Sequence, residues 1–206
     1  MSRADYPPDI PSVTEILGRT GWTGDFGGMP RERLAQLAEV GTYVHACTEA
    51  MDTDTLDLGA TIDQAQSALD RNPYFAHVAP YLKGYALFRT EIEVQILGSE
   101  QAIRHDALRY CGTLDRRVMI AGDEAVIDIK TSQSVSPSWA LQLAAYAMAV
   151  ENGTPLKRFA LRLMRDGTYR LDQFDGPDDR ELFAIAARSV NAQIAAKVWR
   201  VQRRDP

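Results

Sequence analysis

Residues 112–146, GTLDRRVMIAGDEAVIDIKTSQSVSPSWALQLAAY, decide the fold that this sequence predicts. Val126 to Lys130 alternates apolar and charged residues, which is the period of a β-strand, and residues 113–120 also resemble a strand in composition. Between these runs, Ala121-Gly122-Asp123-Glu124 is typical of a turn. We therefore predict a β-hairpin centred on Gly122-Asp123.

This hairpin would gather charged side chains on one face. In the register expected for that turn, Asp115 lies opposite Lys130 and Arg117 lies opposite Asp128. Two carboxylates and an amine on one patch fit a divalent-metal site with a catalytic lysine, because carboxylate oxygens suit Mg²⁺ or Mn²⁺. The same residues are also compatible with an ordinary ion pair on a solvated hairpin face. Unpaired charges among aliphatic neighbours are costly, however, which argues against that alternative. The other face is apolar apart from Arg116, which the pattern does not explain: Leu114, Val118, Ile120, Ile127 and Ile129.

A helix is expected directly after the hairpin. Ser136 can cap it, Pro137 suits its first position, and residues 139–150 continue it. Gln142 and Tyr146 are four residues apart, so they share one face of this helix.

Three motifs in this stretch resemble the PD-(D/E)XK nuclease superfamily: Gly-Thr-Leu-Asp (112–115), Ile-Asp-Ile-Lys-Thr (127–131) and Gln142-x-x-x-Tyr146. The most similar branch is the RecB-like one, which includes phage exonucleases and CRISPR-associated nucleases. The resemblance implies an α/β fold, with a mixed central sheet flanked by helices and an N-terminal helical extension. It also implies the roles of the motif residues. One or two Mg²⁺ or Mn²⁺ ions would be held by Asp115, Asp128 and the Ile129 carbonyl. Lys130 would orient or activate the attacking water and stabilise developing negative charge. Gln142 and Tyr146 would lie over the site and steer the substrate or the lysine.

A second part of the resemblance lies in the helix predicted for residues 31–51, where Gly41, His45 and Glu49 share a face. A glycine inside a helix costs about 1 kcal/mol against alanine, which indicates a close-packing reason for Gly41. His45 by itself fits a structural histidine better than a ligand. The resemblance reverses this preference, because RecB-like nucleases carry a Gly-x-x-x-His helix before the core and use its histidine as a metal ligand.

The remaining N-terminal elements precede the predicted sheet. Residues 1–11 are expected to be extended, Ser12-x-x-Glu15 is a capping box, and residues 61–71 and 73–89 are expected to be helical. The loop at 18–30 is interpreted as a connector packed by Trp22 and Phe26, with a base-stacking flap as the alternative. Residues 91–97 alternate as a strand. The family often has an active-site glutamate on its first core strand, and either Glu91 or Glu93 could be that residue or lie on a solvated face.

The C-terminal part is predicted to contain a hairpin, 157–164 with 168–174, and a helix over 178–199. The resulting element order matches the superfamily core. We predict one nuclease domain over 1–206, with a helical part (1–90), a central sheet with the motif helix (91–174) and a C-terminal helix (175–206). Basic residues in this region form either a solvated face or a phosphate-contacting patch: Lys157, Arg158, Arg162, Arg165, Arg170, Lys197, Arg200, Arg203 and Arg204.

Composition restricts the partners. The net charge of −5 argues against a broad clamp on duplex DNA, whose phosphates attract lysine and arginine, but it leaves room for a narrow metal-bearing site. No run is long enough to span a bilayer and no signal peptide is visible, so no membrane association is expected. The two cysteines, Cys47 and Cys111, are too few for a disulfide framework and favour a reducing cytoplasm. The resemblance implies that this is the cytoplasm of a prokaryotic or phage-infected host cell. The cysteines are also too few for the iron–sulfur cluster of many RecB-like relatives, which needs four.

We therefore expect a metal-dependent DNA nuclease. The resemblance implies an exonuclease that acts in phage or prokaryotic DNA recombination, repair or processing. We expect it to prefer DNA ends or single strands, with bases stacking on Trp22, Phe26 or Tyr43. A catalytically silent DNA-binding or assembly protein with the same fold is the alternative, and the complete Asp, Asp, Lys and His set argues against it. An enzyme acting on small phosphate esters is disfavoured because no Gly-x-x-x-x-Gly-Lys loop occurs. Oligomeric state and a recombination or processing partner protein stay open.

Overall fold

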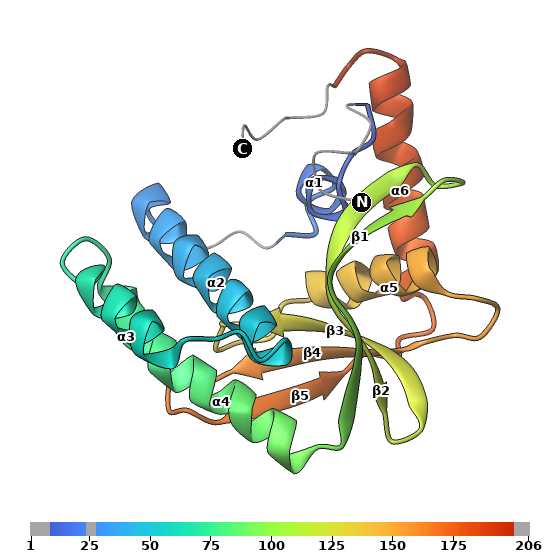
Figure 1. Ribbon diagram of the computed structural model, residues 1–206. Helices are drawn as coiled ribbons and strands as arrows, with labels where there is room; N and C mark the ends of the chain where they lie inside the picture. The colour runs from blue at the N-terminus through green and yellow to red at the C-terminus, as the bar shows by residue number, and fades with distance from the viewer. Residues whose placement is uncertain (1–8, 24–27, 200–206) are drawn as a thin grey trace.

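The computed structural model describes residues 9–23 and 28–199, which build a five-stranded sheet with helices on both faces (Figure 1). The strands follow chain order across the sheet: β1 (Val94–His105), β2 (Tyr110–Ile120), β3 (Asp123–Lys130), β4 (Lys157–Leu163) and β5 (Tyr169–Gln173). All neighbouring pairs are antiparallel except β3 and β4, which are parallel. A parallel pair needs a crossover connection, and α5 (Ser138–Val150) provides it.

The two faces of the sheet contribute to two separate apolar clusters, because successive strand side chains point in opposite directions. Val126 and Ala160 pack with α1 (Val13–Arg19), α5 and α6 (Asp179–Ala195). Ile127, Ile129 and Leu161 pack with the N-terminal helices on the other face. Those helices are α2 (Arg31–Asp52), α3 (Leu58–Ser67), the 3₁₀ helix η2 (Pro73–His77) and α4 (Val78–Glu91). The predicted α/β fold, a mixed sheet flanked by helices with an N-terminal helical part, is confirmed.

The central hairpin forms, but its register differs from the predicted one. Ile120 pairs with Asp123, so the turn is the two-residue loop Ala121-Gly122, with φ of 51° and 85° at the two positions. Positive φ at both residues is the type I′ geometry, whose twist matches that of the flanking strands. Each predicted partner therefore moves by two residues, and the pairing of Asp115 with Lys130 is wrong. A shift of two preserves the alternation between the two faces, so the charged patch survives. Leu114 is an exception to the predicted apolar face, because it packs in the cluster of Val126.

Element boundaries differ from expectation where capping residues were not recognised. The Ser12–Glu15 capping box is confirmed, and α3 begins earlier than predicted because the Asp57 side chain caps it. The helix predicted over 73–89 divides into η2 and α4, and α6 ends at Ala195. In the described part of the chain, no helix combines the length and apolarity needed to cross a bilayer.

Two further expectations concern particular residues. A Cβ at Gly41 would meet only the Thr131 hydroxyl, at 3.8 Å, so the expected close packing there is wrong. The Tyr43 hydroxyl donates to the Thr61 carbonyl (3.0 Å) and its ring packs on Phe75, so Tyr43 holds α3 against α2 and is not free to stack on a base. Phe26, Arg200, Arg203 and Arg204 lie outside the described residues.

Candidate metal centre

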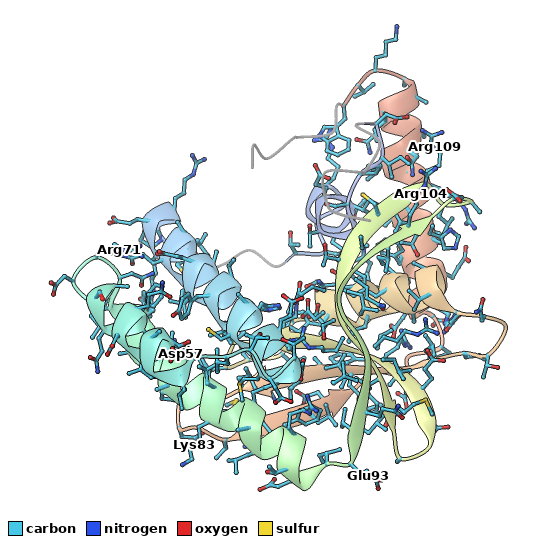
Figure 2. All side chains as sticks on the ribbon, viewed as in Figure 1. Asp57, Arg71, Lys83, Glu93, Arg104 and Arg109 are labelled. Carbon is cyan, nitrogen blue, oxygen red and sulfur yellow. The ribbon has the colours of Figure 1, made fainter. Side chains whose placement is uncertain are left out.

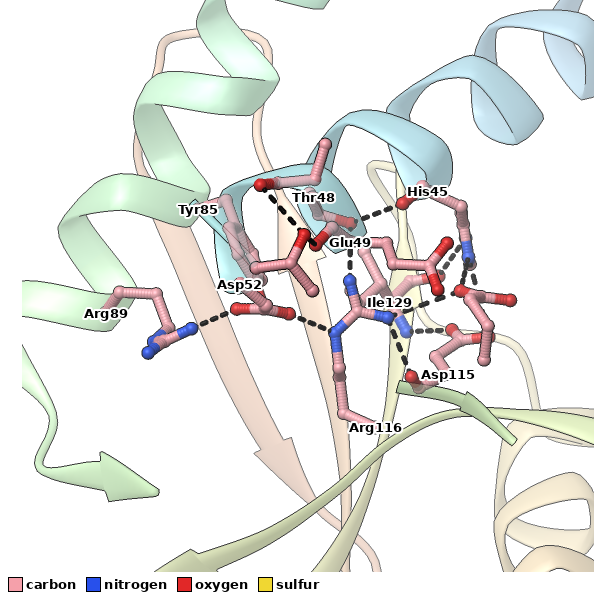
Figure 3. Close-up of polar contacts among 12 residues, drawn as sticks. His45, Thr48, Glu49, Asp52, Tyr85, Arg89, Asp115, Arg116 and Ile129 are labelled. Carbon is pink, nitrogen blue, oxygen red and sulfur yellow. Dashed lines mark hydrogen bonds and ion pairs between the residues drawn. The ribbon is translucent and has the colours of Figure 1, made fainter. Parts of the chain in front are cut away.

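Three segments far apart in sequence meet at His45 of α2, Asp115 in the middle of β2 and Ile129 near the end of β3 (Figure 3). His45 Nε2 lies 3.1 Å from the Ile129 carbonyl oxygen, and His45 Nδ1 lies 3.5 Å from Asp115 Oδ1. The other oxygen of Asp115 accepts a hydrogen bond from the Ile129 backbone N–H (2.6 Å). The histidine on the N-terminal helix and the motif aspartate therefore contact each other, as the sequence analysis expected.

Glu100 is a member of this group that the sequence analysis missed. Its Oε1 lies 3.6 Å from His45 Nδ1. One ligand atom each from His45, Glu100 and Asp115 lie within 4.8 Å of one another, which is close enough to hold one metal ion.

Glu100 reaches the centre because β1 contains one extra residue. The pairing of β1 with β2 shifts by one residue between Ile96 and Gly98. Without that bulge Glu100 would lie opposite Leu114; with it, Glu100 falls opposite Asp115 and shares its face. Glu100 also adopts φ of 46°, the left-handed region that costs energy for residues other than glycine. Strand alternation cannot anticipate a bulge, and no simple signal in the sequence marks Glu100.

The two glutamates expected near the site lie elsewhere. Glu91 is the last residue of α4 and accepts a hydrogen bond from the Tyr169 hydroxyl (3.0 Å). Glu93 is exposed just before β1 and points outward (Figure 2). The strand begins later than predicted because α4 continues through Glu91, and the glutamate of the first core strand that lies beside His45 and Asp115 is Glu100.

A second group adjoins the centre, on the face of the sheet that α5 covers. The buried carboxylate of Asp128 forms an ion pair with Lys130, whose Nζ donates to Gln142 Oε1 (3.0 Å). The Gln142 amide nitrogen donates to Asp128 Oδ1 (3.2 Å) and to the Tyr146 hydroxyl oxygen (2.9 Å). The Lys130 ammonium also lies over the Trp139 ring, 5.6 Å from its centroid. The structure thus brings together the four polar residues that the hairpin and the following helix were predicted to supply.

The charges of this region perturb one another strongly. Burial alone would lower the pKa of His45, but Asp115, together with Glu100 and Asp128, raises it to about 10. Burial opposes ionisation of Asp115, yet His45, Lys130 and the Ile129 N–H hold the pKa of Asp115 below its usual value. Burial raises the pKa of Asp128 to about 6, although Lys130 opposes the change. Without metal, a protonated imidazole therefore supplies the positive charge between the carboxylates.

The donor set fits a divalent cation. Carboxylate oxygens suit Mg²⁺ and Mn²⁺, and an imidazole nitrogen in the same set favours Mn²⁺. His45 has to lose its proton to become a ligand. Asp128 is held by Lys130 and Gln142 and lies outside the group of His45, Glu100 and Asp115. The part of Asp128 in metal binding therefore belongs to the proposal below.

These features place the chain among α/β proteins in which a histidine and two carboxylates, close enough to hold a metal ion, lie beside a mixed sheet. Residues 19–204 match the family model of the PD-(D/E)XK nuclease superfamily, and the chain belongs to that superfamily.

The comparison with solved structures gives the fold. The chain is similar to a candidate exonuclease from Eubacterium rectale, with a TM-score of 0.57 and 12% identity, covering 100% of this chain and 96% of that chain. A second match, to SSO0001, has 14% identity over 81% of this chain and 84% of that chain. Its TM-score of 0.38 is too low to indicate a shared fold. No curated protein sequence matches the chain.

Proposed function

We propose that this chain is a divalent-metal-dependent deoxyribonuclease that hydrolyses phosphodiester bonds, preferentially at ends or in single strands. The observation that carries the proposal is the convergence of His45, Glu100 and Asp115 within 4.8 Å, beside the ion pair of Asp128 and Lys130. Membership of the superfamily supports a nuclease, and the name of the Eubacterium rectale protein supports an exonuclease. The motif spacing supports membership of the RecB-like branch, and that membership would imply a role in phage or prokaryotic DNA recombination, repair or processing.

In this proposal His45, Glu100 and Asp115, with Asp128 and the Ile129 carbonyl, hold one or two Mg²⁺ or Mn²⁺ ions. A bound cation would stabilise negative charge on the scissile phosphate and lower the pKa of a water ligand. These residues come from four elements of the fold, α2, β1, β2 and β3. The centre would therefore be complete only when α2, which carries His45, is docked on the sheet.

Lys130 supplies a preorganised positive charge beside the ligands. Asp128 and Gln142 fix the position of its ammonium group, and the Trp139 ring covers one side. A charge held in place before the reaction stabilises negative charge that develops in the transition state without paying for reorganisation. Gln142 binds Lys130, Asp128 and Tyr146 together, so it acts by orienting the catalytic lysine and the carboxylate.

The preference for ends or single strands rests on charge and on architecture. A duplex clamp needs many lysine and arginine contacts, and the net charge of the chain is −5. Sequence readout in duplex DNA needs a dedicated element in the major groove. Each α-helix of the described residues packs against the sheet or against another helix, so none stands apart as a recognition element.

Digestion of matched DNA substrates tests the proposal. A linear duplex, a closed circular duplex and closed circular single strands of one sequence are incubated with Mg²⁺, with Mn²⁺ and with a chelator. We expect the linear molecule to be degraded to short products only when metal is present, while the closed duplex is spared. Efficient cutting of the closed duplex into discrete fragments would refute the exonuclease assignment. Binding of DNA with no hydrolysis in either metal would instead favour a silent DNA-binding protein.

A further inference from the structure

Directly beside the candidate centre, a buried arginine occupies the apolar face of the hairpin. Arg116 is only 1% exposed, and it follows Asp115 on β2. Its Nε donates to Asp52 (2.5 Å), its Nη2 to the Thr48 hydroxyl (3.0 Å) and its Nη1 to the Asp115 backbone carbonyl (2.7 Å), as Figure 3 shows. All three nitrogens of the guanidinium group are therefore engaged.

Asp52, the main partner of Arg116, is itself held on two more sides. Its side chain is 1% exposed and accepts from the Tyr85 hydroxyl at 2.8 Å from each oxygen, and it also pairs with Arg89. The guanidinium carbon of Arg116 lies 5.9 Å from the centroid of the Tyr85 ring. Arg116 thus ties β2 to the last turn of α2 and, through Tyr85 and Arg89, to α4.

Stability does not account for this cluster. Burying a charged pair costs several kcal/mol of desolvation, and apolar residues of similar volume in its place are often as stable or more stable. The same face of the hairpin is otherwise aliphatic, so a large apolar residue at position 116 would continue its pattern. A specific geometric role is the remaining physical reason for an arginine.

The geometry of the cluster points to that role. Arg116 Nη1 lies 3.3 Å from Glu100 Oε1, the same oxygen that lies 3.6 Å from His45 Nδ1. His45, Thr48 and Asp52 recur at spacings of three and four along α2, so they lie on one face of that helix. Holding Thr48 and Asp52 therefore fixes the rotation of α2 that presents His45.

We propose that Arg116 is a positioning residue that sets the three ligand-bearing elements, α2, β1 and β2, relative to one another. The inference rests on the proposed metal centre and names a determinant of its geometry. The planar guanidinium group presents several donors in a fixed arrangement, whereas a lysine ammonium is a point charge on a flexible stem. Lysine at position 116 would keep the charge and lose the simultaneous contacts to Asp52, Thr48, Glu100 and the Asp115 carbonyl.

The test compares Arg116→Lys with a matched control, Arg158→Lys. Arg158 is also a buried arginine of the sheet, 6% exposed. Its guanidinium pairs with Asp179 (2.9 Å) and donates to the Ala140 and Gly176 carbonyl oxygens, none of which is a proposed ligand, so it is not free to contact a phosphate. Mn²⁺ binding is measured by calorimetry, and DNA hydrolysis is measured against Mn²⁺ concentration. Residues that orient metal ligands typically contribute 10- to 100-fold in metal affinity. We expect Arg116→Lys to weaken Mn²⁺ binding by about tenfold or more and to shift the half-maximal Mn²⁺ concentration equally. Arg158→Lys should lower the melting temperature while leaving both quantities unchanged.

A second variant keeps the inference testable if Arg116→Lys does not fold. Thr48→Val is close to isosteric and removes the hydroxyl that accepts from Arg116 (3.0 Å) and donates to the His45 backbone carbonyl within α2 (2.9 Å), and it should weaken Mn²⁺ binding in the same direction. Folded Arg116→Lys or, if that variant does not fold, folded Thr48→Val with wild-type Mn²⁺ affinity would overturn the inference. Wild-type protein that binds no Mn²⁺ would overturn the proposed metal centre itself, and this inference with it.

Discussion

Replacing Lys130 with methionine separates the charge of this residue from its packing. Methionine keeps an unbranched stem over the Trp139 ring and removes the ammonium that pairs with Asp128 and donates to Gln142. If the ammonium stabilises charge in the transition state, DNA hydrolysis should fall by about 10²- to 10³-fold, the usual cost of removing one such donor.

The same variant should remain folded, and the structure gives the magnitude. Lys130 is 20% exposed on its side chain, and the loss of a partner to a buried polar group costs about 1–3 kcal/mol. The cost is limited because the pKa of Asp128 is already about 6. Without Lys130 that pKa rises further, so Asp128 takes up a proton more readily and the cost of leaving its charge unpaired is limited. At about 2–4 °C per kcal/mol for a chain of this size, the melting temperature should fall by roughly 2–12 °C.

The assay combines thermal melting with digestion of end-labelled linear DNA at saturating Mn²⁺. Lys157→Met is the matched control, because Lys157 is 47% exposed and its ion-pair contact with Asp123 is 3.6 Å long. The control should keep the wild-type melting temperature and lose far less turnover than Lys130→Met, because an exposed lysine at this position can contribute at most a phosphate contact. A folded Lys130→Met or Lys130→Ala protein with near wild-type turnover would refute the assignment of Lys130 as a catalytic residue.

The remaining predictions concern the metal. His45→Ala should weaken calorimetric Mn²⁺ binding or lose a site, and unchanged stoichiometry and affinity would return His45 to a structural role. Because the pKa of metal-free His45 is about 10, Mn²⁺ binding should release a proton, and affinity should rise about tenfold per pH unit between about pH 6.5 and 8.5. Calorimetry in buffers of different ionisation enthalpy counts that proton, and a pH-independent affinity would contradict the expectation. The raised pKa also means that His45 stabilises the metal-free fold below about pH 6.5 and that this contribution is lost as the pH rises through about 10, which melting curves can follow. The purified protein should contain no iron–sulfur cluster, since Cys47 and Cys111 are too few, and visible absorbance with bound iron would contradict this.

Local pattern was enough to predict much of the fold. Strand alternation gave the central hairpin, and spacing along the chain placed Asp128 with Lys130 and Gln142 with Tyr146. These pairs depend on neighbours within one element, which is why an error of two residues in the hairpin register left the charged face intact. The position of His45 could not be derived in this way, because it depends on how α2 docks on the sheet. Its assignment came from resemblance to a family.

The residues that local pattern failed to explain lie next to the ligands. Arg116 interrupts an apolar face, and the reason is Asp52, a partner 64 residues away that only the folded chain supplies. The pairing period of β1 breaks between Ile96 and Gly98, and that bulge places Glu100, which also adopts a positive φ, opposite Asp115. Natural sequences tend to violate local rules at functional sites, where the cost in stability is accepted for geometry. Arg116 and Glu100 are also in contact with each other, so two independent exceptions meet at one carboxylate oxygen 3.6 Å from His45. A metal centre that needs Glu100 held against His45 accounts for both exceptions, whereas a merely structural hairpin accounts for neither.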